Sequence, residues 1–209
     1  MLCGSCEGFL SQAYEKYGTR LFKNKRLILE SPDSRVFLKF DYQRFFLYAT
    51  SILWRASLSK QSDFVLAKDF ALISEFFRSC IQRQSLLLPS SSEPGLRLDH
   101  FVTVSIVKVT ENTDLLPQSV IDSTLMYPRL DLNIERATVV TYYFMVDGFV
   151  VRLSVHKIDS SGFTSLGTAI LGRIKDRSFI KIPTIDIANY PAILRFFSAA
   201  AKAKVQWPK

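Results

Sequence analysis

The stretch TVVTYYFMVDGFVVRLSV, residues 138–155, decides the fold. Two runs rich in β-branched and aromatic residues flank Asp147-Gly148, a pair that favours the tight type I′ turn of a two-residue hairpin. We therefore expect two antiparallel strands joined at Asp147-Gly148. Four shorter segments also carry strand signals: RVFLKF at 35–40, HFVTVSIVKV at 100–109, TSLGTAILG at 164–172 and RSFIKIP at 177–183.

Helical spacing dominates the chain before residue 88 and returns at its end. The apolar pattern predicts helices at about 7–22, 41–59, 63–87 and 189–205. In the first, Leu10, Tyr14, Tyr17 and Leu21 fall on one face, and Asp41 is placed to cap the second. The order of the elements predicts an α+β fold, with N-terminal helices, then an antiparallel sheet, then one C-terminal helix.

Composition limits the classes of protein that the chain can represent. Its 209 residues are 48% apolar, which indicates a packed core and argues against disorder. The most apolar stretch has ten residues between Arg44 and Arg55, against the roughly 20 that a bilayer requires, and the first residues do not have the basic start of a signal peptide. We therefore expect a cytoplasmic protein without a membrane contact.

The net charge of +8 favours anionic partners, nucleic acid first, although many basic proteins bind nothing acidic. Residues 1–60 contain ten lysines and arginines against five acidic residues, so about +5 lies there. The best candidate phosphate contacts are Arg20, Lys23, Lys25 and Arg26, with Lys16 beside them. A solvated basic turn is the competing interpretation.

Cys3-Gly4-Ser5-Cys6 is a C-x-x-C motif directly before the first expected helix. Such a pair can supply two of the four thiolates of a structural zinc site, and the start of a helix favours thiolate charge. A redox motif of the thioredoxin kind needs a preceding strand, for which Met1 and Leu2 leave no room. Two exposed thiols without a role are the third interpretation. Cys80 is expected to be a small buried residue.

The opening of the chain resembles a family of bacterial HNH-endonuclease-like proteins with a treble-clef zinc site. The matching positions are Leu2 to Glu7, Phe9, Glu15, Phe22, Tyr42 and SILWR at 51–55. The resemblance covers about residues 2–56. It implies that Cys3 and Cys6 are two zinc ligands and that residues 1–24 are the remnant of a zinc-knuckle element. Residues 25–209 would then form one α+β domain, helical over 25–88 and sheet-rich over 96–209, with the loop PSSSEPG between these parts.

The resemblance also implies an upstream C-x-x-C and an HIIP-like segment whose histidine would be the general base. We expect both to lie before Met1, so the chain carries no catalytic residue of that motif. His100 and His156 stand at strand ends and are expected to be structural. Asp131 and Glu135 could form a carboxylate pair, but a solvated strand face is the favoured interpretation.

Two hypotheses follow from these observations. In the first, the chain is a nucleic-acid-associated relative of HNH-like nucleases that is catalytically incomplete, or completed by a partner, with half a zinc site that a partner could complete. In the second, it is a non-catalytic protein-interaction module, or a homodimer in which two copies pool four thiolates on one shared zinc.

Overall fold

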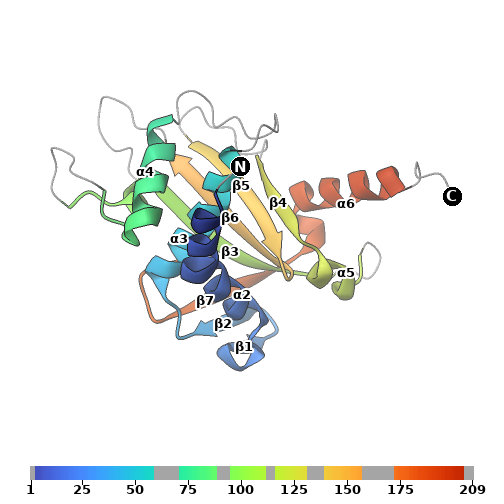
Figure 1. Cartoon of the computed structure of the whole chain (residues 1–209). Helices are drawn as coiled ribbons and strands as arrows, with labels where there is room; N and C mark the ends of the chain where they lie inside the picture. The colour runs from blue at the N-terminus through green and yellow to red at the C-terminus, as the bar shows by residue number, and fades with distance from the viewer. Residues whose placement is uncertain are drawn as a thin grey trace.

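The computed structural model describes residues 3–58, 71–88, 95–111, 116–130, 139–156 and 172–204. In this part of the chain, seven strands form one sheet in the order β1-β2-β7-β3-β6-β5-β4 (Figure 1). The strands are β1 Ile28–Ser31, β2 Ser34–Leu38, β3 Val102–Thr110, β4 Met126–Leu130, β5 Val139–Val146, β6 Phe149–His156 and β7 Phe179–Asp186. Neighbouring strands are antiparallel except β3 and β7, which run parallel.

The hairpin of β5 and β6 has the predicted turn. Val146 pairs with Phe149, and the two residues between them, Asp147 and Gly148, have φ angles of 52° and 70°. Two consecutive left-handed residues are the mark of a type I′ turn, whose twist matches that of the strands. The prediction of a hairpin at Asp147-Gly148 is confirmed.

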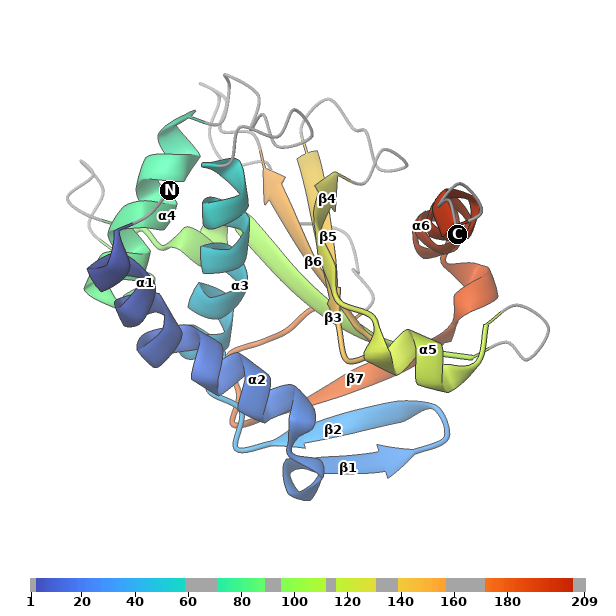
Figure 2. The same cartoon turned by 45° about the vertical axis from the view of Figure 1, so that its right-hand side comes forward.

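Helices cover both faces of the sheet unequally. Figure 2 shows α1 to α4 on one side of the sheet and α6 on the other. The helices are α1 Gly4–Leu10, α2 Lys16–Lys23, α3 Tyr42–Ser57, α4 Ala71–Arg83, α5 Gln118–Ser123 and α6 Pro191–Lys204. A π-helical turn, Ser11–Glu15, joins α1 to α2, so residues 4–23 are helical throughout. The predicted α+β class is therefore confirmed.

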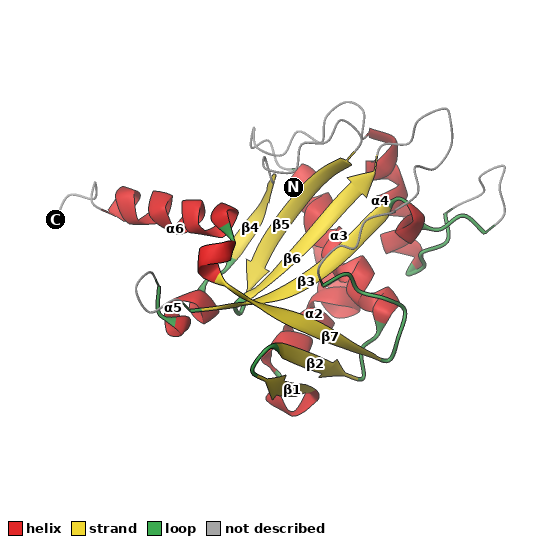
Figure 3. Cartoon of the chain, turned by 180° about the vertical axis from the view of Figure 1, so that it is seen from behind, coloured by secondary structure: helices red, strands yellow, loops and turns green. Residues whose placement is uncertain are grey.

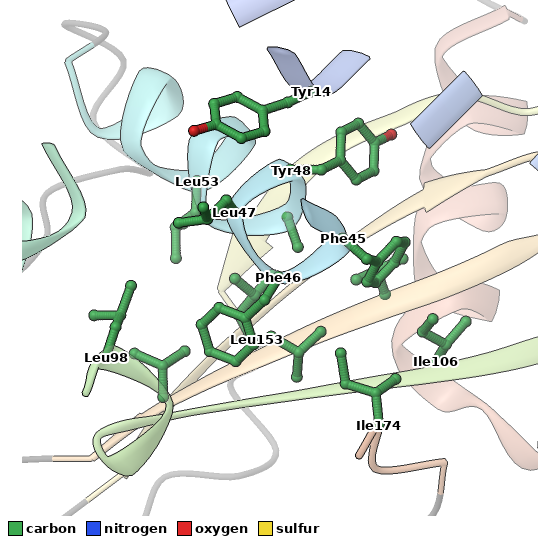
Figure 4. Packing of buried hydrophobic residues seen from close by; sticks show 14 of the residues in the cluster. Tyr14, Phe45, Phe46, Leu47, Tyr48, Leu53, Leu98, Ile106, Leu153 and Ile174 are labelled. Atoms are coloured by element: carbon green, nitrogen blue, oxygen red, sulfur yellow. The ribbon is translucent and has the colours of Figure 1, made fainter. Parts of the chain in front are cut away.

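Helix α3 is the centre of the core. The Asp41 carboxylate accepts a hydrogen bond from the Arg44 backbone N–H at 2.9 Å, which confirms Asp41 as the N-cap. Phe45, Phe46 and Leu53 are at most 1% exposed, and they pack between the sheet and the neighbouring helices (Figure 4). A helix that is apolar over so much of its surface must be covered on several sides.

Three phenylalanines from distant parts of the chain join the first helix to the sheet. Phe22 of α2, Phe37 of β2 and Phe149 of β6 have ring centroids 5.2–5.9 Å apart. Each ring is at most 3% exposed, and burial of such a side chain is worth roughly 1.5–3 kcal/mol. Residues of α1 and α2 thus belong to the same hydrophobic core as the sheet. The expected division of the chain at residue 24 stays a prediction.

A second, smaller core lies on the other face of the sheet. Val107, Met145 and Val150 pack there against Ile121 of α5 and Ile193 of α6. This smaller core lies near the C-terminal end of β3, next to the turn of the β5–β6 hairpin.

The observed elements differ from the expected ones at several places. Helix α5 and strand β4 lie in a stretch for which no element is expected. The strand expected at 35–40 is present as β2, but it joins the sheet through β7, so the sheet does not lie wholly after the N-terminal helices. Helix α4 ends at Arg83, earlier than expected, because Gln84 has a φ of 51° and the chain turns there. The parallel pairing of β3 and β7 arises because β7 enters between β2 and β3. Residues 63–70, most of 164–172, and Asp131 with Glu135 lie outside the described residues.

Candidate nucleic-acid interface and cysteine pair

Cys3 and Cys6 lie together at the start of the first helix. Cys3 is the N-cap of α1, and its sulfur accepts a hydrogen bond from the Cys6 backbone N–H at 3.4 Å. The two Sγ atoms are 3.1 Å apart, and the Ser5 hydroxyl lies 3.0 Å from the Cys3 sulfur. Both cysteines are exposed. The C-x-x-C motif therefore forms a single, accessible dithiol.

The two thiols differ in acidity because their sulfurs have different hydrogen bonds. Hydrogen bonds from Ser5 and Cys6 lower the pKa of the Cys3 thiol to about 7. The hydrogen bond with Cys3 raises the pKa of the Cys6 thiol. Close to half of the Cys3 population is then thiolate at neutral pH. Cys80 is different, since burial raises its pKa to about 11, in agreement with the expected structural role.

The dithiol fits half of a zinc site. Thiolate zinc sites are tetrahedral with Zn–S distances of about 2.3 Å, so two of their sulfurs lie roughly 3.7 Å apart. Cys3 and Cys6 would have to separate by roughly half an ångström to reach this geometry. Among the described residues, no three His, Cys, Asp or Glu side chains gather in a way that could hold a metal ion. The nearby Glu7 carboxylate lies 3.5 Å from the Arg55 guanidinium.

Two of the basic residues predicted as phosphate contacts, Arg20 and Lys23, line a shallow, open groove of about 620 Å³ together with Lys16. The described side chains that line it come from one helical segment: Ser11, Glu15, Lys16, Thr19, Arg20, Lys23 and Asn24. Lys25 and Arg26 follow directly in a 3₁₀ turn, in which the Asn24 side chain accepts a hydrogen bond from the Arg26 N–H at 3.1 Å. All five basic side chains are exposed. The structure thus brings the four predicted contacts to one end of the helix.

The groove carries a net positive charge. Within the described part of the chain, no carboxylate lies at ion-pair distance from Lys16, Arg20, Lys23, Lys25 or Arg26. Some basic residues elsewhere are paired with acids, such as Arg97, whose guanidinium lies 2.9 Å from the Asp99 carboxylate. Glu15 is the acidic residue among the described lining residues, and its carboxylate lies 2.6 Å from the Arg55 guanidinium. Glu15 therefore subtracts little from the charge of the groove.

The cysteine pair and the groove lie on the same helical segment. Arg20 stands fourteen positions after Cys6, which corresponds to roughly 21 Å at about 1.5 Å per residue, but the lining of the groove begins at Ser11, five positions after Cys6. A metal at the thiols would therefore lie close to the first lining residues and far from Arg20 and Lys23.

Two tyrosines near the groove pack in the core and are not free to stack on bases. Tyr14 is 2% exposed, and its hydroxyl donates a hydrogen bond to the Ile81 carbonyl at 2.6 Å. The Tyr17 hydroxyl accepts one from the Asp41 N–H at 2.8 Å, and the Arg44 guanidinium lies 5.3 Å from the Tyr17 ring centre. Burial raises the pKa of both phenols to about 12. The expected core role of these residues agrees with the structure.

Neither histidine lies among the described residues that line the groove. His100 is exposed in the 3₁₀ turn Leu98–His100. His156 is the last residue of β6, and burial together with the nearby Arg173 lowers its pKa.

Sequence reasoning missed a polar region on the second face of the sheet, the face whose backbone is turned toward the viewer in Figure 3. Alternate residues of β6, Arg152, Ser154 and His156, share this face, and Thr103 and Thr141 lie opposite Ser154 on the two neighbouring strands. The alternation of FVVRLSVH is the signal that could have revealed it.

Comparisons with protein-family models, with curated proteins and with solved structures found no match. In the described part of the chain, every helix is too short or too polar to cross a bilayer.

Proposed function

We propose that this chain binds nucleic acid by contacting backbone phosphates through the basic groove of residues 11–26. The observation that supports this proposal most directly is that three exposed basic side chains without an acidic partner, Lys16, Arg20 and Lys23, line an open groove, and that Lys25 and Arg26 follow directly after it. Salt-dependent contacts of this kind supply most of the affinity in sequence-independent binding, because they release counterions from the phosphates.

The spacing of the basic residues suits a phosphate backbone. Lys16, Arg20 and Lys23 stand at i, i+4 and i+7, so they span roughly 10 Å along one side of the helix. One strand of duplex DNA presents a phosphate about every 3.4 Å of helix axis, so this row faces about three phosphates. Such contacts position the ligand and do not read its sequence.

We further propose the nuclease-like lineage that the resemblance implies, with Cys3 and Cys6 as two of four zinc ligands. The role assigned to the chain is binding and not cleavage, since neither His100 nor His156 is among the described residues that line the groove. The remaining two zinc ligands would come from outside the described residues.

The binding proposal is tested by fluorescence anisotropy with a labelled duplex over a range of salt concentrations. We expect the triple variant Lys23→Ala/Lys25→Ala/Arg26→Ala to reduce the slope of log K against log salt by about 2.7, or about 0.9 for each lost contact. The matched control is Lys175→Ala/Arg177→Ala, which removes exposed charge from the loop before β7. An equal loss in both variants, or no binding by the wild type at low salt, would exclude the groove as the site.

A zinc-bridged homodimer is a second candidate, because both thiols are exposed at the very start of a helix and are open to a second copy. Metal analysis combined with a measurement of molecular size distinguishes a zinc-bridged homodimer from a zinc site completed within one chain. One zinc for every two chains, with dimers that dissociate in a chelator, supports the homodimer. One zinc for each monomeric chain supports a site completed within the chain. Cys80→Ser is the control, and zinc content unaffected by Cys3→Ser/Cys6→Ser excludes both.

A further inference from the structure

The second face of the sheet is divided into an apolar half and a polar half. Val107, Val150 and Met145 form the apolar half, which α5 and α6 cover. The three residues belong to β3, β6 and β5. Toward the end of the sheet where β6 finishes, the residues of these strands on the same face are polar. On the opposite face, the same strands stay apolar, as in Val104, Leu153 and Phe144. The fold alone therefore does not explain the polar half.

The register of the strands places the polar residues side by side. Ser154 lies between Thr103 and Thr141, and its hydroxyl is 2.9 Å from that of Thr141. Arg152, the next outward residue of β6, lies opposite Ser105, and a β-bridge places Arg173 on the far side of Ser105. His156 is the next outward residue of β6 after Ser154. Diagonal neighbours in a sheet are roughly 7–8 Å apart, so one small ligand can touch side chains of adjacent strands.

Two groups in this region are buried without a hydrogen-bond partner. Within the described residues, neither the Thr103 Oγ1 nor the His156 Nε2 has one, and Thr103 is 3% exposed. Thr141 and Ser154 satisfy each other, so the deficit belongs to Thr103 and His156. Buried polar atoms without partners are rare, and a bound ion or water is a common reason for them.

The charge of the region indicates which ligand would satisfy these atoms. Arg152 and Arg173 flank Ser105, and Arg173 is near enough to His156 to lower its pKa. Arg152 has contacts of its own and contributes its charge. Hydrogen-bond donors beside guanidinium groups suit an anion with several oxygens. Hydrogen bonds to a charged acceptor are shorter and stronger than those between neutral groups.

We infer that the polar half of this face binds a small oxyanion of the phosphate class. Thr103 Oγ1 and His156 Nε2 donate hydrogen bonds to its oxygens, and Arg173 pairs with its charge. The groove of residues 11–26 lies on the helical segment that packs on the opposite face, so this site is separate from the proposed nucleic-acid interface.

The inference is tested with inorganic phosphate in the triple variant Lys16→Ala/Arg20→Ala/Lys23→Ala, which removes the three basic side chains that line the groove. At phosphate ten times above Kd we expect a rise in Tm of roughly 3–5 °C over chloride of equal ionic strength. The His156 imidazole signals in the NMR spectrum should shift over the same concentrations, while those of His100 stay in place. A phosphate monoester in a parallel titration distinguishes a free ion from the phosphate group of a larger molecule, since tighter binding of the ester indicates the latter.

Two isosteric variants separate binding from folding. Thr103→Val should abolish the phosphate-dependent rise in Tm without lowering the Tm in phosphate-free buffer, because it removes a hydroxyl that has no partner. Thr184→Val is the matched control. Thr184 also has an unpartnered buried hydroxyl, but it lies opposite Lys108, on the face of the sheet that α1 to α4 cover. His156→Gln should weaken the response at least tenfold. The inference would be overturned if phosphate did not raise the Tm of the triple variant, or if it raised the Tm equally after Thr103→Val is added.

Discussion

The Glu15 carboxylate lies 2.6 Å from the Arg55 guanidinium, across the contact between the first helix and α3. Arg55 also lies 3.5 Å from Glu7, so one arginine of the core helix neutralises two acids of the first helix. Since Glu15 lines the basic groove, this pairing helps to decide how positive the groove is. Arg55 thus acts on the groove without lining it, as far as the described residues show.

Removal of Arg55 should weaken nucleic-acid binding although Arg55 touches no ligand. In Arg55→Gln the Glu15 charge is left uncompensated beside Lys16 and Arg20, and we expect duplex affinity to fall by about two- to fivefold, the range that corresponds to a partly exposed ion pair. The double variant Glu15→Gln/Arg55→Gln keeps the wild-type net charge and should recover the affinity. Fluorescence anisotropy at a single low salt concentration measures the duplex affinity of the wild type, the single variant and the double variant. An equal loss in the single and double variants would show that Arg55 acts through packing.

The acidity of Cys3 should be visible in its alkylation. Thiolates are the reactive form, so the rate of reaction with iodoacetamide follows the thiolate fraction. We expect Cys3 to reach half its maximal rate near pH 7 and Cys6 to react only at higher pH. Mass spectrometry of the N-terminal peptide distinguishes the two positions.

Ser5→Ala and Cys6→Ala test the cause of that acidity. Each removes a hydrogen bond to the Cys3 sulfur, so the half-maximal pH of Cys3 should move up toward the ordinary thiol value of about 8.5. The change should be larger in Ser5→Ala, because the Ser5 hydroxyl lowers the pKa of Cys3 most. Identical profiles in wild type and Ser5→Ala would contradict the observed contact.

Asp99 should make the stability of the fold sensitive to acid. Burial raises the pKa of its carboxyl, but hydrogen bonds from Arg97 at 2.9 Å and Tyr42 at 3.0 Å outweigh burial and hold the pKa below its usual value. A carboxyl with a lowered pKa in the folded state stabilises the protein above its unfolded pKa of about 3.9, and that stabilisation is lost as the pH falls through the folded pKa.

Urea unfolding of Asp99→Asn at two pH values checks this expectation. At pH 7 the variant should have a lower midpoint than the wild type, and the difference should shrink toward pH 3 as the wild-type carboxyl takes up a proton. Asp33→Asn, in the exposed turn between β1 and β2, is the control for the substitution itself. A difference between Asp99→Asn and wild type that is constant from pH 7 to pH 3 would mean that the charge of Asp99 does not matter.

Local signals in the sequence were sufficient for the hairpin, the cap of α3 and the longer helices, but not for the short helix α5 or the end of α4. Asp147-Gly148 dictates its turn through backbone conformation, and Asp41 caps α3 through a contact three residues away. Both depend on neighbours in the chain. The basic groove could be predicted for the same reason, since Lys16, Arg20 and Lys23 share a side of one helix by spacing alone.

Long-range relationships could not be predicted. The insertion of β7 between β2 and β3 depends on which sheet edges remain open after the rest of the chain has folded. The polar half of the second face depends on the register of three strands, which brings Thr103 beside Ser154 across 51 positions of sequence. The alternation in FVVRLSVH places Arg152, Ser154 and His156 on one face of β6, but no single segment shows which residues of β3 and β5 lie beside them.

The first helix packs so closely on α3 that one of its glycines cannot be replaced. A Cβ at Gly18 would overlap the ring of Tyr48, which is 6% exposed and surrounded by Phe22, Phe45 and Phe144. Because the ring cannot move without displacing its neighbours, we expect Gly18→Ala to destabilise the fold by about 1–3 kcal/mol.

Gly8→Ala is the matched control for this prediction, in the same helical segment. Nothing lies within 4 Å of a Cβ at Gly8, and the residue is exposed, so replacement by the better helix former should stabilise the fold by about 0.5–1 kcal/mol. Chemical denaturation of both variants gives the two free-energy changes, which should have opposite signs. If Gly18→Ala is also stabilising, the first helix does not pack on Tyr48 in solution, and the groove that this helix carries loses its fixed position relative to the sheet.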